Sequence, residues 1–438
     1  MTSLDAPRDP SAGGRAPADT ATGAPPDPTP GVATGADRRK LMASLLGGYL
    51  FLFATYAGVI AILLPYQVGL IDADAKVGNL AIVTSLSALA TIVAQPIVGA
   101  LSDRTRTRLG RRAPWMVFGG IGGGILTIAL QFSTTIFWIA ALWVLAQVLL
   151  NAFQAPMSAV IADRVDERHR ATASAFTGVG TALGATIGIV VAGQLLTTLG
   201  VAYTLFGGLV IVAAVAFVLL NPDRTEVAPV TDTFRWGAFF RGFWVSPRKH
   251  PDFGWAFGGR FFMVLGTQGL ANYQFYVLTD YIHLDPISAG GIAGTLSLCS
   301  VVTTVIGTLV FGRLSDVMRR RKIFVFGASI VVVIGVMIPV FSPTVTGMIL
   351  MSLVMGIGSG AYTAVDFALM VDVLPSRGDA GKDLGVLNIA SNVPQALVGS
   401  VAVALLAMSA GNYAIIFFFA AISVIISSLL VLPIKSVR

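Results

Sequence analysis

Apolar segments of about 20 residues follow one another along the chain from residue 43 onward, and short polar stretches separate them. A helix needs about 20 mostly apolar residues to cross a bilayer. Lipid tails cannot form hydrogen bonds with backbone N–H and C=O groups, so such segments must be helical. The pattern predicts an all-α membrane protein with twelve transmembrane helices, at residues 43–66, 77–101, 114–133, 136–162, 171–198, 201–221, 253–278, 286–312, 322–342, 345–372, 383–408 and 412–434.

Two short motifs occur twice, about half a chain apart. The stretch Gly-x-Leu-Ser-Asp ends at Asp103 and again at Asp316, 213 positions later, with basic residues after both copies. Similar Ala-containing stretches end at Asp163 and at Asp372, 209 positions apart. Internal repeats are the usual construction of secondary transporters. We therefore expect two pseudo-symmetric six-helix halves, with a tail at 1–38, an N-terminal bundle at 39–221, a linker at 222–252 and a C-terminal bundle at 253–438.

The tail and the linker lack long apolar runs. Residues 1–38 are rich in proline and glycine, which predicts disorder. The tail has no apolar segment of the signal-peptide type, so we expect no cleavage there. In the linker, aromatic residues between 234 and 244 are interleaved with Arg235 and Arg241. This favours an amphipathic helix on the membrane surface, with a plain linker as the alternative.

Composition and charge placement support the membrane assignment. The chain is 55% hydrophobic and 12% charged, against about 25% charged in soluble domains. With the N-terminus inside, only Lys76 among the 29 Lys and Arg residues falls in an outside loop, and only Arg260 falls well within a helix. Cytoplasmic loops retain basic residues. We expect a protein of the cell inner (plasma) membrane with both termini in the cytoplasm. The net charge of +7 follows from these basic residues, so it does not indicate a nucleic-acid partner.

Catalytic and cofactor motifs are missing from the sequence. No phosphate-binding loop or HExxH motif occurs, and the three histidines fall in loops. The single cysteine, Cys299, lies in an apolar helix and rules out an intrachain disulfide. We expect a protein that is not an enzyme, with no metal and no cofactor.

Two charged residues lie inside predicted helices, where charges are costly and mark functional sites. Arg260 is six residues or so into the seventh helix, and Asp366 is about eight from the inner end of the tenth. At 1.5 Å per residue, both lie ~9 to ~12 Å from the cytoplasmic edge, so the two side chains could meet. Three alternatives follow: the pair carries the coupling proton on Asp366, the pair joins two helices permanently, or the two residues do not make contact.

Amide and tyrosine side chains mark the predicted substrate path. Gln147, Asn151 and Gln154 are spaced four and three apart, which places them on one helix face. The eleventh helix repeats this spacing. Amides suit sugar hydroxyls, although they also join helices to one another. The predicted binding residues are Tyr56, Gln147, Asn151, Gln154, Gln268, Asn272, Tyr273, Tyr276, Tyr362, Asn388, Asn392 and Gln395, with Gln95 as a further candidate.

The loop after the second predicted helix reads GALSDRTRTRLGRRAP. It resembles the signature loop of the major facilitator superfamily, and the longer string SDRTRTRLGRRAPW resembles its glycoside and sucrose cation-symporter branch. The resemblance implies a charge network that holds the cytoplasmic side closed. The alternative is that the arginines only set the orientation of the protein in the membrane, and we favour this alternative for Arg104. The implied gate residues are Gly99, Asp103, Arg104, Arg111, Arg112, Asp163, Arg170, Gly312, Asp316 and Asp372.

The resemblance leads to a transporter that works by alternating access. The fifth helix, 171–198, has no proline, unlike drug–proton antiporters of the family. The first three helices have no acidic residue, unlike sodium-coupled melibiose-type symporters. We therefore expect a monomer in the lipid bilayer that moves a small solute, through proton-coupled symport of a sugar or glycoside. Efflux of an amphipathic drug-like or metabolite compound is the alternative. A membrane sensor or enzyme on the same fold would need a further domain or a catalytic site.

Overall fold

The computed structural model describes residues 33–222, 250–318, 320–372 and 380–434, with no side-chain detail at 316, 367, 368, 370–372 and 380–389. The predicted surface helix of the linker lies outside this part. The helices are α1 (Gly35–Gly58), η1 (Val59–Leu63), α2 (Leu64–Ile71), α3 (Lys76–Arg104), α4 (Ala113–Ala129), η2 (Leu130–Phe132), α5 (Ile136–Arg164), α6 (Glu167–Gln194), η3 (Leu196–Thr198), α7 (Leu199–Leu220), α9 (Pro251–Tyr276), η4 (Val277–Tyr281), α10 (Pro286–Met318), α11 (Arg321–Phe341), α12 (Val345–Asp372), α13 (Ala380–Met408) and α14 (Ala414–Val431).

The described residues form twelve spanning helices, which confirms the predicted fold. The first span is continuous through α1, η1 and α2. Eleven helices are long and apolar enough to cross a membrane by composition. The helix α9 is the twelfth span, and it packs against α13 and α14. Its amides and Arg260 reduce its hydropathy.

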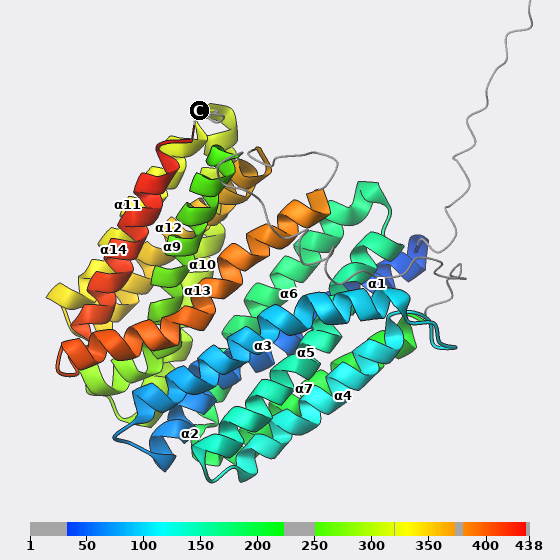
Figure 1. The fold of residues 1–438 in the computed structure, drawn as a ribbon, viewed down its shortest axis with the longest axis horizontal. Helices are drawn as coiled ribbons and strands as arrows, with labels where there is room; N and C mark the ends of the chain where they lie inside the picture. The colour runs from blue at the N-terminus through cyan, green and yellow to red at the C-terminus, as the bar shows by residue number, and fades with distance from the viewer. Residues whose placement is uncertain (1–32, 223–249, 319, 373–379, 435–438) are drawn as a thin grey trace, which may run out of the picture.

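The two halves pack with matching helix pairs. In the N-terminal half α1 packs on α6, α3 on α5, and α4 on both α5 and α7. In the C-terminal half α9 packs on α13, α10 on α12, and α11 on both α12 and α14. The same architecture is therefore built twice, and the helices of each half lie together in Figure 1.

Close helix contacts in each half depend on glycine. A Cβ atom on Gly184 or Gly188 of α6 would lie 2.3 or 2.1 Å from a backbone oxygen of α1. A Cβ atom on Gly360 of α12 would lie 2.1 Å from a backbone oxygen of α10. Small residues let helix backbones approach in this way, and van der Waals contact then holds them together in lipid.

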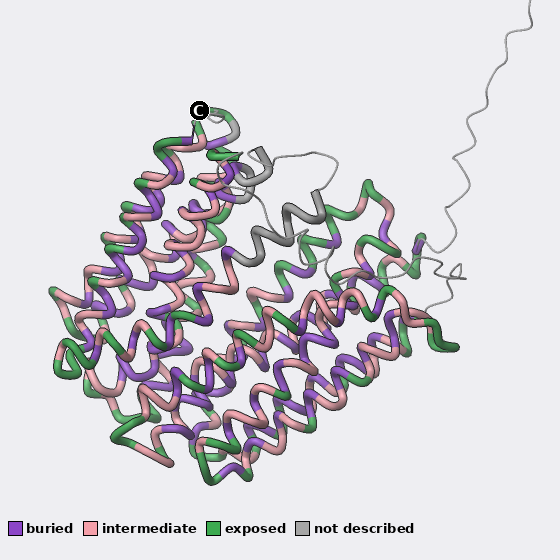
Figure 2. The backbone as a smooth tube through the Cα atoms, in the orientation of Figure 1, coloured by how far each residue is buried: buried purple, intermediate pink, exposed green. Residues whose placement is uncertain are grey.

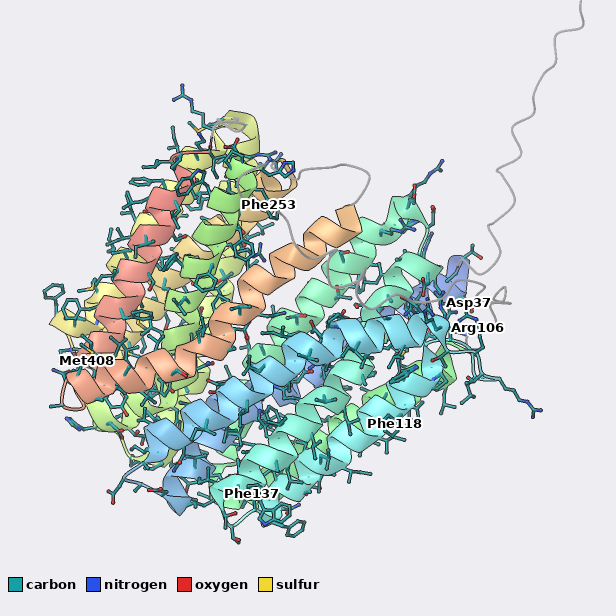
Figure 3. All side chains as sticks on the ribbon, in the orientation of Figure 1. Asp37, Arg106, Phe118, Phe137, Phe253 and Met408 are labelled. Carbon is teal, nitrogen blue, oxygen red and sulfur yellow. The ribbon has the colours of Figure 1, made fainter. Side chains whose placement is uncertain are left out.

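Within the described part of the chain, the main contacts between the halves gather toward one end of the molecule. The helix α3 packs on α13 where Gly399 meets Ala81, and α6 packs on α10 where Gly193 meets Gly290. Away from this closed end the two groups of helices diverge (Figure 1). In Figure 3, Phe137 and Met408 mark the closed end, while Asp37, Arg106 and Phe253 mark the open end.

The outer faces of the helices are apolar and exposed. Buried and exposed positions alternate along the helices (Figure 2), and Phe118 of α4 and Phe137 of α5 are 63% and 72% exposed. Contiguous exposed hydrophobic faces of this size are rare on soluble proteins. They fit a surface that contacts lipid tails.

The loop before α10 shows how local chemistry starts a helix. The Asp285 carboxylate accepts hydrogen bonds from the backbone N–H groups of Ile287 and Ser288, at 3.1 and 3.0 Å. Hydrogen bonds from Ser288, through its side chain and its backbone, hold the pKa of Asp285 below its ordinary value. This is the side-chain capping that the first turn of a helix requires.

Candidate functional site

A polar cavity of about 310 Å³ lies between the halves, close to their contacts at the closed end. The described residues that line it belong to α1, η1, α3 and α5 of the N-terminal half and to α9 and α13 of the C-terminal half. We call it the amide cavity, because its lining includes Gln95, Gln147, Asn151, Gln154, Asn272, Asn392 and Gln395.

Helical spacing brings the predicted amides to this cavity. Gln147, Asn151 and Gln154 share one face of α5, and all three line the cavity as the spacing predicts. On α13, Asn392 and Gln395 also line it. The side chain of Asn388, predicted for the same face, lies outside the described residues.

Several polar groups of the amide cavity have no partner. In the described part of the chain, no hydrogen bond reaches the hydroxyl of Tyr56 or Oδ1 of Asn151, and both atoms are buried. The Asn151 amide nitrogen donates to Thr91 Oγ1 at 3.2 Å and to the Gln147 carbonyl at 2.7 Å. An unsatisfied buried polar atom costs about 1–3 kcal/mol. A ligand hydroxyl that bonds Tyr56 and Asn151 would recover this energy.

The remaining amides extend the same pattern. Among the described residues, nothing bonds the side-chain amides of Gln95, Gln147, Gln154, Asn272 or Asn392. The Gln395 amide donates to the Ser391 carbonyl at 3.1 Å. Each amide offers two donors and one acceptor oxygen. The cavity therefore has the hydrogen-bonding capacity for a small solute with many hydroxyl groups.

Four predicted binding residues do not line this cavity. Tyr273 is 1% exposed and donates to the Gly399 carbonyl at 3.5 Å, which joins α9 to α13. Tyr276 contacts the N-terminal half at the closed end, and Tyr362 is buried one turn before Asp366 on α12. Gln268 lies on α9 outside the cavity lining. The sequence placed these residues on the right helices, but it did not show which way each helix faces.

Apart from Gln95, the α3 residues of the cavity wall were not predicted from the sequence. Thr84, Ser87 and Thr91 line it at spacings of three and four, next to Phe53 of α1 and Ile60 of η1. Thr84 and Ser87 bond carbonyls of their own helix, which leaves small polar surfaces toward the cavity. The spacing of these hydroxyls along one helix face was the available signal.

A buried ion pair joins three helices of the C-terminal half. The Arg260 Nη1 atom lies 2.9 Å from Asp366 Oδ2, so the predicted contact between them is confirmed. The Arg260 Nε atom donates to Ser391 Oγ at 2.9 Å. The side chains are 28% and 8% exposed. Arg260 of α9 thus holds both Asp366 of α12 and Ser391 of α13, the residue next to the cavity residue Asn392.

The predicted gate residues of the N-terminal half gather at the open end. Arg112 is 8% exposed and lies 2.5 Å from Asp103 and 3.0 Å from Asp163, and Arg111 lies 2.6 Å from Asp163. Arg170 donates to carbonyls at the end of α5. These contacts tie α3, α4, α5 and α6 of the N-terminal half together. The remaining predicted members are Gly99 and Arg104 on α3 and Gly312 on α10, while the side chains of Asp316 and Asp372 lie outside the described residues.

A second ion pair connects the halves at the closed end. Lys76 Nζ at the start of α3 lies 2.8 Å from Asp280 Oδ1 in η4. Tyr413 donates to the other Asp280 oxygen at 2.8 Å, and Lys76 lies 5.1 Å from the ring centre of Tyr276. The Tyr276 hydroxyl donates to the Pro65 carbonyl of α2 at 3.0 Å. We call the Lys76–Asp280 pair and its two tyrosines the clasp.

Matching π-helical turns lie beside the clasp. The turn η1 covers Val59–Leu63 in the first span, and η4 covers Val277–Tyr281 in the seventh. Single π-turns inside α-helices often occur at functional sites, and they bend the helices that contain them. Both turns lie next to contacts between the halves.

Comparison with known sequences now decides the family. Residues 45–293 and 257–437 match the family described as Major Facilitator Superfamily. The chain belongs to this superfamily. A stretch of 114 residues is 32% identical to the inner membrane metabolite transport protein YgcS of Escherichia coli (strain K12), and it covers 26% of this chain and 24% of that protein. The match thus spans about a quarter of the length of that relative.

Solved structures share the fold of this superfamily member. A variant of the nucleoside transporter NupG aligns with a TM-score of 0.71 at 14% identity, over 89% of this chain and 98% of that one. A bacterial homolog of the human lysosomal transporter Spinster, in an inward-facing and occupied conformation, aligns with a TM-score of 0.66 at 13% identity, over 91% and 95% of the two chains. The chain is therefore a multi-pass membrane transporter by family, and it shares the fold of these structures.

Proposed function

We propose that this transporter carries a sugar or glycoside together with a proton, by alternating access between its two halves. The observation that carries the proposal is the amide cavity, whose free amides and unpaired Tyr56 hydroxyl face a space of about 310 Å³. Small-molecule sites span about 300–1,000 Å³. None of the described residues that line the cavity is charged. This favours a neutral solute rich in hydroxyl groups.

The orientation follows from the basic residues. Arginines of the loop at 104–112 lie at the open end, and cytoplasmic loops retain such residues. We therefore assign the open end and both termini to the cytoplasmic side of the inner membrane. In this assignment the amide cavity is accessible from inside, and the clasp closes the outside. A single chain contains the whole cavity, so we propose a functional monomer.

The coupling step is assigned to Asp366. When Asp366 accepts a proton, its carboxylate loses the negative charge that holds Arg260. Arg260 also binds the Ser391 hydroxyl, and the Ser391 carbonyl accepts from the cavity residue Gln395. Protonation at Asp366 therefore changes the position of α13 and of the amides it carries. Solute and proton are linked because both act on this segment.

The test uses the purified protein in proteoliposomes with a pH indicator inside. Added sugars and glycosides should acidify the interior of vesicles that contain wild-type protein. Asp366→Asn should abolish uptake driven by a pH gradient, while exchange of labelled solute for unlabelled solute continues, because exchange needs no net proton movement. Asp285→Asn is the matched control, since Asn also caps helices well.

Two outcomes would overturn the proposal in different ways. If Asp366→Asn still accumulates solute against its gradient, the proton does not travel on this residue. If no sugar or glycoside moves protons while an imposed pH gradient expels an amphipathic dye, the protein is an efflux transporter instead.

A further inference from the structure

Two buried hydroxyl groups without partners lie beside the ion pair of Asp366 and Arg260. Tyr362 precedes Asp366 by four positions on α12, so both side chains share one face of that helix. Tyr362 is 6% exposed, and Ser427 of α14 is 0% exposed. In the described part of the chain, neither hydroxyl forms a hydrogen bond. Buried polar groups are normally paired, so these two need an explanation.

Helix packing brings the two hydroxyls together. The Tyr362 hydroxyl lies next to the Asp366 carboxylate and the Ser427 hydroxyl. Ser427 packs against Gly259 of α9, where a Cβ atom would lie 3.4 Å from the Ser427 carbonyl oxygen and 4.0 Å from its Oγ atom. Gly259 directly precedes Arg260. The described charged or titratable groups that act on Asp366 are Arg260 of α9 and Tyr362 of α12 itself. Residues of α9, α12 and α14 therefore form one buried polar cluster.

Protonation changes what Asp366 requires from its neighbours. The charged carboxylate accepts hydrogen bonds, and Arg260 donates one from Nη1 at 2.9 Å. The neutral acid has an O–H group that must donate, and Arg260 has no lone pair that could accept from it. A buried donor without an acceptor is costly. A hydroxyl group can both donate and accept, so Tyr362 is able to bond either form of Asp366.

We propose that Tyr362 and Ser427 form a hydroxyl relay that holds the protonated form of Asp366. In the charged form, the Tyr362 O–H group donates to the carboxylate. When a hydronium ion delivers its proton, one of its O–H bonds breaks and one forms on Asp366. The new O–H group donates to the Tyr362 oxygen, and the Tyr362 O–H group turns to donate to Ser427 Oγ. Both hydroxyls keep their own protons. They are positioning residues for the proton, and this inference rests on the proposed role of Asp366.

The test follows the carboxyl group itself by infrared spectroscopy. The full-length protein in nanodiscs is titrated with acid without any solute, and a protonated carboxyl group gives a C=O band that carboxylates lack. The band of Asp366 is the one that disappears in Asp366→Asn. Tyr362→Phe removes one oxygen atom, and it should weaken proton binding at Asp366 about tenfold. Its C=O band should also move to higher wavenumber, because the acid has lost a hydrogen bond.

A second variant tests the order of the relay. Ser427→Ala leaves Tyr362 in place but removes the acceptor for its hydroxyl, so it should weaken proton binding by a smaller factor. The double variant should weaken proton binding no further than Tyr362→Phe alone, because Ser427 acts only through Tyr362. Ser428→Ala and Tyr281→Phe are the matched controls, since each of these hydroxyls already bonds a backbone carbonyl. Both controls should leave the titration of the band unchanged.

The outcomes separate the inference from the proposed function. If no carboxyl band disappears in Asp366→Asn, Asp366 does not carry the proton, and the proposed coupling fails together with the relay. If the band is present but Tyr362→Phe changes neither its titration nor its wavenumber, only the relay is overturned. Additive effects of Tyr362→Phe and Ser427→Ala would also overturn the relay, because the two hydroxyls would then act separately.

Discussion

Breaking the clasp should shift the protein toward an alternative state in which the end that is closed in this structure is open. Lys76 of one half and Asp280 of the other are 2.8 Å apart, and their side chains are 24% and 25% exposed. The pair exists only while the halves touch at the closed end. Lys76→Gln removes the charge and keeps a polar side chain of similar length. The substitution should therefore destabilise the present state relative to the alternative one.

The exposure of the pair sets the size of the effect. Fully exposed ion pairs contribute about 0–1 kcal/mol, and breaking a fully buried pair costs about 3–5 kcal/mol. For a pair that is one quarter exposed, and whose carboxylate also accepts from Tyr413, we expect about 1–2 kcal/mol. Because 1.4 kcal/mol is a factor of ten in an equilibrium constant, the ratio of the two states should change about fivefold to thirtyfold.

Spin-label distances measure this ratio directly. Cys299 is the single cysteine, so Cys299→Ser provides a background for two new labels at the closed end. Asp74→Cys labels the N-terminal half and Ile287→Cys labels the C-terminal half, both at exposed positions. Lys76→Gln should increase the fraction of molecules in which the two labels are far apart.

Two further variants make the clasp experiment decisive. Lys40→Gln makes the same change at an exposed position of the open end and should have no effect. Exchanging the charges, with Lys76→Asp and Asp280→Lys together, should restore much of the short-distance population. The reasoning is refuted if Lys76→Gln leaves the distances unchanged, or if the charge exchange shifts them as far as the single variant does.

Two other predictions concern packing and binding. Gly188→Leu should destabilise the protein by about 3 kcal/mol or more, because its Cβ atom would lie 2.1 Å from the Ala54 carbonyl. The unfolding temperature in detergent measures this loss of stability. Gly178→Leu is the control, because nothing lies within 4 Å of a Cβ atom there, and it should change the unfolding temperature little. An equal loss of stability in both variants would contradict the packing argument. Asn151→Leu should weaken solute binding about tenfold, since it removes the acceptor that is unpaired in the cavity. Calorimetry in nanodiscs tests this, and unchanged affinity would show that the solute does not contact this amide.

Local patterns in the sequence were sufficient for the helices and for part of the site. The apolar segment lengths predicted all twelve spans, because lipid forces long apolar segments into helices. Helical spacing predicted the shared face of Gln147, Asn151 and Gln154, which line one cavity. The depth of Arg260 and Asp366 predicted their contact, because an isolated charge within the bilayer is costly.

The direction in which a helix faces was harder to predict. Tyr273 and Tyr276 share α9 with Asn272, yet they join helices or close one end, while Asn272 lines the amide cavity. All three are polar and within one turn, so composition does not distinguish them. The hydroxyls of α3 were overlooked because Thr and Ser often bond their own helix backbone, as Thr84 does.

The sequence by itself determined the membrane class, the twelve spans, the repeated halves and the family, because each follows from local hydropathy, spacing or motif. Only the tertiary structure decided which end of the two halves is closed, that Lys76 pairs with Asp280, and that helices of both halves line one amide cavity. Lys76 and Asp280 are 204 positions apart in the chain, and the amide cavity brings together residues from both halves. These features depend on how two bundles of similar sequence pattern meet, and a one-dimensional pattern does not contain that geometry.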